Sequence, residues 1–179
     1  MRNAILTIFV LLPIVSQAQI DQATDVLKSE IDAVLNAPEG GVDRQIKVVD
    51  IGKLNVAVGV LHRDRIEAGG PVRGVAHSQV TEVYYVLSGS GTLVTSGEIN
   101  DPAPFPEDSE VVQIAVGPSV VADFTGGEQR TISAGDVVVI PAGVLHGWAE
   151  VPDHVTYLSV RPDPDRVLPA GYVNPALTP

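Results

Sequence analysis

The sequence predicts an all-β protein in which many short strands form a barrel or sandwich, preceded by one helix. Short runs of β-branched residues alternate with Gly, Pro and Asp, as is typical of antiparallel sheets. Only one segment shows apolar residues at helical spacing. No helical crossovers lie between the strands, so a parallel α/β sheet is not expected. The length of 179 residues suits a single domain with its own core.

Residues 1–18 are predicted to form a secretory signal peptide. Arg2 gives a basic start, Ala4–Val15 is an apolar run, and Ser16-Gln17-Ala18 offers small residues at the cleavage positions. The run is shorter than the roughly 20 apolar residues that a membrane-spanning helix needs. We therefore expect cleavage after Ala18 and a mature protein that is secreted or periplasmic and free of the membrane.

Residues 19–43 are predicted to form the helix and a linker. Within Asp21–Asn36, apolar residues recur every three or four positions, and Asp21 can cap the start. Pro38, Gly40 and Gly41 then end the helical pattern.

Residues 44–168 are predicted to form the barrel, followed by a C-terminal tail over 169–179. Each expected strand is a short run bounded by turn residues. The expected strands are Gln45–Ile51, Leu54–His62, Gly74–His77, Glu82–Ser88, Gly91–Thr95, Val111–Val116, Ser119–Phe124, Asp136–Ile140 and Thr156–Arg161, with one more opening at His146.

The segment Gly97–Glu110 interrupts this pattern with three prolines and five acids. Proline at that density is excluded from a sheet interior. The segment is expected to be a solvated loop, or alternatively a lid over the mouth of a barrel.

Composition excludes several classes of function. A formal net charge of −11 argues against nucleic-acid binding, which requires a basic face for the phosphates. The absence of cysteine excludes a disulfide scaffold, a thiolate metal site and a thiol nucleophile.

Two histidines and one acid are placed to meet inside such a barrel. His77 lies near the end of one short strand and Glu82 begins the next, so a tight turn brings both side chains inside. His146 opens another strand after the turn at Pro141-Ala142-Gly143. Two imidazoles and one carboxylate form a three-ligand site with open positions, which suits Fe(II) and is compatible with Mn, Zn, Ni or Co.

At these residues the sequence resembles the cupin superfamily. Its first motif is matched in every spacing by Gly69, Val75, His77, Glu82 and Gly89, and its second by Gly135, Pro141, Gly143 and His146, with Glu150 where Asn is usual. The resemblance implies a jelly-roll barrel closing on a central pocket. It also implies that His77, Glu82 and His146 occupy metal-ligand positions.

Val75 stands where the family has its first histidine, and it cannot bind a metal. The site is then a two-histidine, one-carboxylate triad, or it has lost its metal, or His62 supplies the missing ligand. Without a metal, Glu82 should be protonated or paired with an internal arginine. Arg161 is expected to meet either an anionic ligand or a surface acid.

The pocket walls are predicted to include Val75 together with aromatic side chains. Strand alternation places Tyr84 inward and Tyr85 outward, given an inward Glu82. Trp148 shares the parity of His146 and can line the pocket, although packing in the core is the favoured role for these aromatics.

Two classes of function follow from these features. The first is a metal-dependent enzyme that acts on a small organic molecule, since the family includes dioxygenases, isomerases, epimerases and decarboxylases. The second is a non-catalytic module that binds a small ligand or a metal in a degenerate site. A barrel that serves mainly for dimerisation is a third, weaker reading, and the family resemblance implies a homodimer.

Overall fold

The computed structural model describes residues 22–38 and 40–178. The predicted signal peptide, residues 1–18, lies outside this range. No helix within the described residues is long and apolar enough to span a bilayer.

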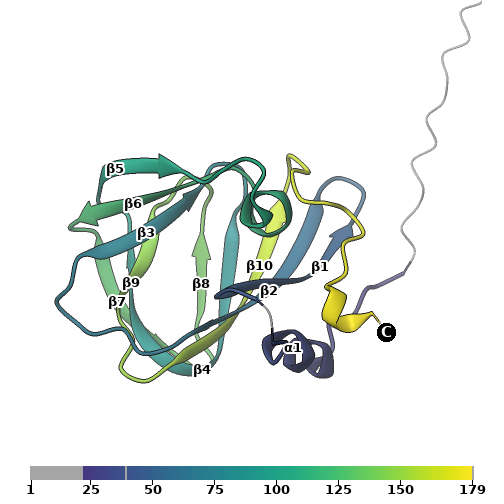
Figure 1. The fold of residues 1–179 in the computed structure, drawn as a ribbon, viewed down its shortest axis with the longest axis horizontal. Coiled ribbons are helices and arrows are strands. Elements are labelled where there is room, and N and C mark those ends of the chain that lie inside the picture. The colour runs from purple at the N-terminus through teal and green to yellow at the C-terminus, as the bar shows by residue number, and fades with distance from the viewer. Residues whose placement is uncertain (1–21, 39, 179) are drawn as a thin grey trace, which may run out of the picture.

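The chain forms an antiparallel sheet that curls into a jelly-roll half-barrel, with one helix at its N-terminal side (Figure 1). The strand order is β1-β2-β10-β4-β9-β3-β6-β5, and β7 and β8 pair with β4. The all-β fold predicted from the sequence is therefore confirmed. The strands are β1 (Asp43–Asp50), β2 (Asn55–Arg63), β3 (Val72–His77), β4 (Glu82–Thr95), β5 (Glu98–Pro104), β6 (Ser119–Thr125), β7 (Glu128–Ser133), β8 (Val137–Ile140), β9 (His146–Glu150) and β10 (Val155–Asp163).

Helix α1 (Lys28–Leu35) is shorter than the predicted Asp21–Asn36. Residues 23–27 are not helical. The Glu30 carboxylate accepts the backbone N–H of Leu27 at 2.9 Å, which fixes the helix start at the following residue. The side chain of Lys47 on β1 pairs with Glu30 and also donates to the carbonyl of Asp25. These bonds tie the segment before α1 to strand β1.

Helix α1 covers the outer face of β1 and β2, as Figure 1 shows. Val34 packs there against Ile46 and Val60. The outer face of β2 is consequently apolar, and its inner face carries Ala57, Gly59 and Leu61, which are also buried. Both faces of this strand are covered, so its hydrophobic pattern does not distinguish inside from outside.

Strand β4 runs unbroken through the two strands predicted at Glu82–Ser88 and Gly91–Thr95. Gly89 joins them with a φ of 72°. A Cβ atom at this position would lie 1.9 Å from the carbonyl oxygen of His154 on the neighbouring chain segment. Because Gly89 has no side chain, β4 can pass close to the His154 backbone, and the strand bends there without ending.

The proline-rich segment contains a strand, which corrects the prediction of a loop over Gly97–Glu110. Strand β5 pairs with β6 at the end of the sheet, where its residues are exposed. The register shifts between Asn100 and Ala103, so Pro102 lies in an irregularity that needs no amide donor. Proline is excluded from sheet interiors and tolerated at such an edge.

Residues Val111–Val116, predicted as a strand, form a π-helical segment, η1. Val112, Ala115 and Val116 are buried, a spacing that belongs to a helix and not to a strand. Ser109 accepts the backbone N–H of Val112, and Gly117 follows with a φ of 68°. These local features favour a helical turn over strand pairing.

The C-terminal segment packs beside β1. The backbone N–H of Val48 donates to Tyr172 at 3.0 Å, and Asn174 donates to the Gln45 carbonyl at 2.7 Å. The segment 169–178 thus lies along β1, at one edge of the sheet, and contacts α1 (Figure 1).

Candidate metal centre

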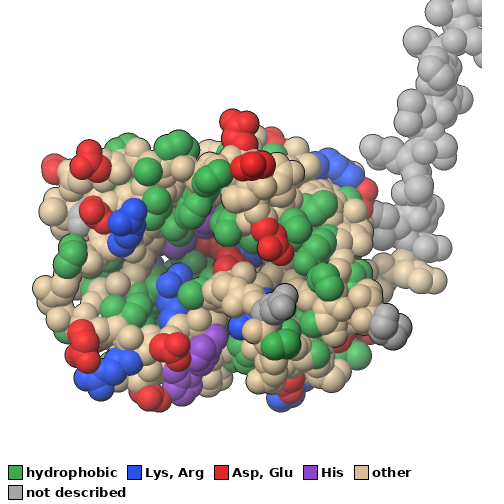
Figure 2. Space-filling view, viewed as in Figure 1, with side chains coloured by type: hydrophobic (Ala, Val, Ile, Leu, Met, Phe, Trp, Pro, Cys, Tyr) green, Lys and Arg blue, Asp and Glu red, His purple; other side chains and the backbone are tan. Residues whose placement is uncertain are grey.

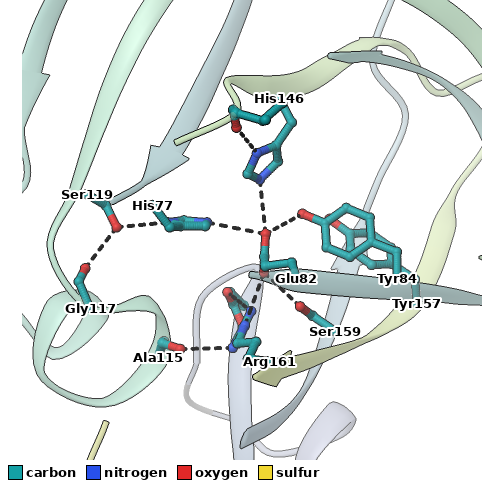
Figure 3. A network of polar contacts seen from close by, with 12 residues as sticks. His77, Glu82, Tyr84, Ala115, Gly117, Ser119, His146, Tyr157, Ser159 and Arg161 are labelled. Atoms are coloured by element: carbon teal, nitrogen blue, oxygen red, sulfur yellow. Dashed lines mark hydrogen bonds and ion pairs between the residues drawn. The ribbon is translucent and has the colours of Figure 1, made fainter. Parts of the chain in front are cut away.

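The structure brings His77, Glu82 and His146 together inside the barrel. Their candidate ligand atoms lie within 4.8 Å of one another, and all three residues are buried. Nε2 of His77 lies 3.3 Å from Oε2 of Glu82, and Nε2 of His146 lies 3.0 Å from the same oxygen. Figure 3 shows the two rings converging on this carboxylate.

Strand pairing explains why these distant residues meet. His77 ends β3, Glu82 begins β4 after a short turn, and His146 begins β9, which pairs with β3. The Gly143 N–H donates to the His77 carbonyl at 2.7 Å and ties the turn before β9 to the end of β3. The turn residues of the second motif therefore place His146 opposite the β3 residues of the first motif.

A hydrogen-bond chain fixes the orientation and tautomer of His77. The Ser119 hydroxyl donates to the Gly117 carbonyl at 2.8 Å, so it must accept from Nδ1 of His77, 2.7 Å away. Nδ1 therefore carries a proton, and Nε2 of His77 is the ring nitrogen directed at Glu82.

His146 is held in the same way. Its Nδ1 lies 3.0 Å from the Val144 carbonyl, which can only accept, so Nδ1 is the donor. Its buried Nε2 makes no hydrogen bond with any described residue. The Nε2 atoms of both histidines thus face one carboxylate oxygen, and each contact is favourable only when a proton or a metal ion lies between the nitrogen and the oxygen.

Glu82 is the centre of the polar network. Oε2 accepts from the Tyr84 hydroxyl at 3.0 Å, while Oε1 accepts from Ser159 at 2.7 Å and from Nε of Arg161 at 3.0 Å. Burial alone would raise the pKa of Glu82, but the charge of Arg161 and contacts with both histidines outweigh it and hold the pKa well below its usual range. Glu82 is therefore an ionised carboxylate.

Arg161 is the residue of this site whose role the sequence left open. It is fully buried, and it is the internal arginine that the sequence analysis required for a Glu82 without metal. Its Nη1 donates to Gln45 at 2.7 Å and to the Ala115 carbonyl at 3.2 Å, and its Nη2 donates to Asp43. Burial raises the pKa of Asp43, and the Arg161 charge opposes that rise.

The three residues fit a divalent metal ion. Two imidazole nitrogens and one carboxylate oxygen form a donor set suited to Fe(II), Mn, Zn, Ni or Co. The unpartnered Nε2 of His146 is the atom that such an ion would satisfy. Ser119, Val144 and Arg161 orient the candidate ligands from behind, as outer partners do in metal sites.

A cavity of about 730 Å³ opens beside this cluster. His77 and Glu82 line it together with Val75 and Tyr84, as predicted for the latter two. Figure 2 shows the hollow, with histidine, acidic and basic side chains inside it. Tyr84 is buried and Tyr85 is exposed, which confirms the inward and outward assignment.

Trp148, predicted as a pocket wall, is not among the cavity-lining residues. It is buried in the main apolar core, with its ring 5.6 Å from that of Tyr157. The Trp148 side chain points into the barrel, as strand alternation predicts. The cavity lies in another part of the barrel, so the ring packs in the apolar core.

His62 lies outside the cluster, contrary to the suggestion that it replaces the missing histidine. Its Nδ1 is 2.8 Å from the Thr156 hydroxyl, its Nε2 is 3.5 Å from Asp64, and its ring stacks on His154. The reason is the parity of β2, where the next residue, Arg63, takes the inner face and lines the cavity. The outer face of β2 is apolar because α1 covers it. That apolar face was taken for the inner one, and His62 was therefore wrongly placed inside the barrel.

The fold and the site define a β-barrel protein with a histidine–carboxylate cluster beside an internal pocket. The cupin family matches residues 29–172, which is most of the chain. The chain therefore belongs to the cupin family.

Comparison with solved structures finds similarity at low sequence identity. The DMSP lyase DddQ from Ruegeria pomeroyi DSS-3 is 17% identical, with a TM-score of 0.37 over 60% of this chain and 38% of that one. A cupin protein from Bacteroides fragilis is 19% identical, with a TM-score of 0.36 over 60% and 65%. The polyketide cyclase RemF from Streptomyces resistomycificus is 18% identical, with a TM-score of 0.41 over 79% and 80%.

The chain thus spans less than two thirds of the length of the first two of these proteins. A comparison with curated proteins finds no significant match.

Proposed function

We propose that the chain is an exported cupin that binds a divalent metal ion with His77, Glu82 and His146 and acts on a small organic molecule in the adjoining pocket. The observation that carries this proposal is the orientation of the histidines. In both rings Nδ1 donates to a partner and Nε2 points at one ionised carboxylate oxygen. A divalent ion bound by these three atoms would balance the carboxylate and give each Nε2 a partner.

The protein groups around the cluster have separate roles in this proposal. A bound divalent ion supplies Lewis acidity, and iron adds reactivity toward dioxygen. Tyr84 donates a hydrogen bond to Oε2 of Glu82, while Arg161 and Ser159 hold Oε1, so the carboxylate cannot rotate. Val75 contributes an apolar wall to the cavity beside the cluster.

Three ligands leave open positions for a substrate, which fits dioxygenase, isomerase or lyase chemistry. Metal analysis and oxygen uptake separate these classes. Iron together with oxygen consumption on a panel of phenols and diketones supports a dioxygenase. Zinc or manganese without oxygen consumption supports isomerase or lyase chemistry.

A non-catalytic binding module is the second candidate, and Arg161 is the observation that favours it. The ion pair between Glu82 and Arg161 balances the buried carboxylate without any metal. Val75 also removes one of the ligands usual in the family. Absence of bound metal after reconstitution would select this alternative.

The metal proposal is tested by purifying the protein without a histidine tag and measuring bound metal. We expect a one-to-one complex with a divalent ion in the wild type and none in His146→Ala. His154→Ala is the matched control, since His154 lies at a partly exposed turn outside the cluster and should leave metal binding unchanged. Equal metal content in both variants would refute the proposed ligand set.

Export is part of the proposal and rests on residues 1–18 alone. We expect the protein recovered from its native cell envelope or medium to begin at Gln19, as measured by intact mass. Recovery of the uncleaved chain from the cytoplasm would contradict this proposal.

A further inference from the structure

Two arginines, Arg44 and Arg63, line the pocket, and another, Arg161, lies directly behind the lining; Arg44 and Arg161 are fully engaged. Nη1 of Arg44 donates to the carbonyls of Val34, Leu35 and Ala37 and so caps helix α1. Arg161 has all three nitrogens bonded, to Glu82, Gln45, Ala115 and Asp43. Neither guanidinium has a free edge for a ligand.

Arg63 is the third arginine, and it differs from the other two. It ends β2 on the inner face, lines the cavity and is partly buried. Its Nε donates to the Tyr157 hydroxyl at 3.1 Å. Within residues 22–38 and 40–178, Nη1 and Nη2 have no hydrogen-bond acceptor and no carboxylate within ion-pair distance.

The position of Arg63 relative to the cluster is set by a chain of contacts. The Tyr84 hydroxyl bonds to Glu82, the Tyr84 ring lies 4.5 Å from the Tyr157 ring, and the Tyr157 hydroxyl accepts from Arg63. Arg63 and the candidate metal ligands are thus separate groups that border one cavity. The tyrosine contact also fixes the guanidinium plane, which lowers the entropic cost of binding a planar anion.

The charges of the pocket favour an anion once a metal is bound. The lining carboxylates Asp43, Glu82 and Glu110 are balanced by Arg44, Arg63 and, directly behind them, Arg161. A divalent ion on the cluster therefore leaves the pocket with a surplus of positive charge. Apart from these groups the lining is largely apolar, including Leu61, Val75 and Ile114.

We infer that the pocket binds a small organic carboxylate with an apolar body, and that Arg63 pairs with the carboxylate through Nη1 and Nη2. A guanidinium with two free parallel donors matches a carboxylate in a bidentate pair. The apolar body of the ligand contacts the valine- and isoleucine-lined wall. The inference rests on the proposed function for its metal-derived charge, but the Arg63 contact itself does not require the metal.

Calorimetric titration with a matched pair of probes tests the inference. The probes are 3-phenylpropanoate and its neutral analogue 3-phenylpropanamide, titrated into zinc-loaded and metal-free protein. We expect the carboxylate to bind at least about tenfold more tightly than the amide, as a charge-assisted pair predicts. We also expect zinc to strengthen carboxylate binding and to leave amide binding unchanged.

Arg63→Gln should weaken carboxylate binding at least about tenfold and leave zinc content and amide binding unchanged. Arg65→Gln is the matched control, because Arg65 is exposed and paired with Glu67 nearby in the chain. Arg63→Lys keeps the charge and loses the bidentate geometry, so an intermediate affinity is expected, and circular dichroism checks that each variant is folded.

Unchanged carboxylate affinity in Arg63→Gln, or equal binding of the amide by the wild type, would overturn the inference. Failure of the metal proposal is seen separately as absent zinc binding. In that case the Arg63-dependent preference for the carboxylate should persist in metal-free protein, and its loss there would overturn the inference as well.

Discussion

Val75 is the residue that most directly sets the ligand count of the site. It lies opposite His146 in the β3–β9 pair and two residues before His77, so all three side chains share one face. A histidine at this position would point into the same cavity that Val75 lines.

Val75→His should therefore tighten metal binding. A fourth protein ligand is expected to raise zinc affinity by about 10- to 100-fold, the range that individual groups around metal sites contribute. Competition with a chromogenic chelator measures this change. Val75→Leu, which preserves an apolar side chain, should leave the affinity near that of the wild type, and a matching increase in Val75→Leu would contradict the ligand explanation.

Arg161 is a fully buried charge paired with two carboxylates, so its removal should destabilise the fold. Replacement by Met would leave Glu82 and Asp43 without their buried counter-charge, at a cost of about 3–5 kcal/mol in the free energy of unfolding. Urea denaturation measures the loss. Saturating zinc should restore part of it, because a cation on the cluster replaces the missing charge.

Arg166→Met is the matched control for this experiment. Arg166 pairs with Asp50 at the surface, where both side chains are solvent-accessible, so its removal should change stability little. Equal destabilisation by the two variants would show that burial of the Arg161 network has no special role.

At the residue scale, the sequence could predict the cluster but not its supporting network. His77, Glu82 and His146 follow from motif spacing, because hairpin geometry converts spacing into position. Arg161 could be placed near the end of its strand, yet its partner was undecidable, since β10 meets β4 only through tertiary pairing. Arg63 was missed because both faces of β2 are apolar, one of them covered by α1. The sequence therefore does not show which side chains of β2 point into the barrel.

At the scale of elements, Gly89 determines whether β4 can continue past the His154 segment. Gly89→Ala combines a positive φ with a Cβ only 1.9 Å from a backbone oxygen, which cannot move away as a flexible side chain would. We expect a loss of stability in urea well above the approximately 1–2 kcal/mol that a left-handed conformation alone costs an alanine.

Gly69→Ala separates the two causes. Gly69 has a φ of 85° but no atom within 4 Å of its Cβ position, so only the conformational cost applies. Similar losses in both variants would mean that the close crossing at Gly89 relaxes without cost.

Two elements were assigned wrongly from the sequence because position and local contacts override composition. Strand β5 contains prolines, and only its place at the sheet edge makes them acceptable. Residues Val111–Val116 have strand-like composition, but the Ser109 contact and Gly117 impose a helical turn. Composition describes what a segment prefers, while edge position and local capping decide between competing structures.

For the whole molecule, an exposed apolar patch supports the expected homodimer. Tyr85 and Leu87 on β4 and Val137 and Val139 on β8 are exposed large hydrophobic residues, and Tyr85 pairs directly with Val137. Within the described residues β8 pairs with one strand only. We propose that a second copy covers this patch around a two-fold axis, which makes the contact self-complementary.

Sedimentation velocity tests this proposal. The wild type should sediment as a dimer and Val139→Asp as a monomer, because a charge within the patch would be buried in the dimer without a partner. Val173→Asp, at an exposed apolar residue beside β1, is the control and should remain dimeric. A monomeric wild type would remove the proposal.

Strand β5 has a consequence for the behaviour of the chain at high concentration. Its outer edge lacks amide donors at Pro102 and Pro104, and the adjoining Pro106 lacks one as well. A foreign strand approaching this border finds no continuous row of hydrogen-bond donors on which to template itself. The same prolines that kept β5 from being predicted as a strand therefore disfavour fibril growth at this sheet edge.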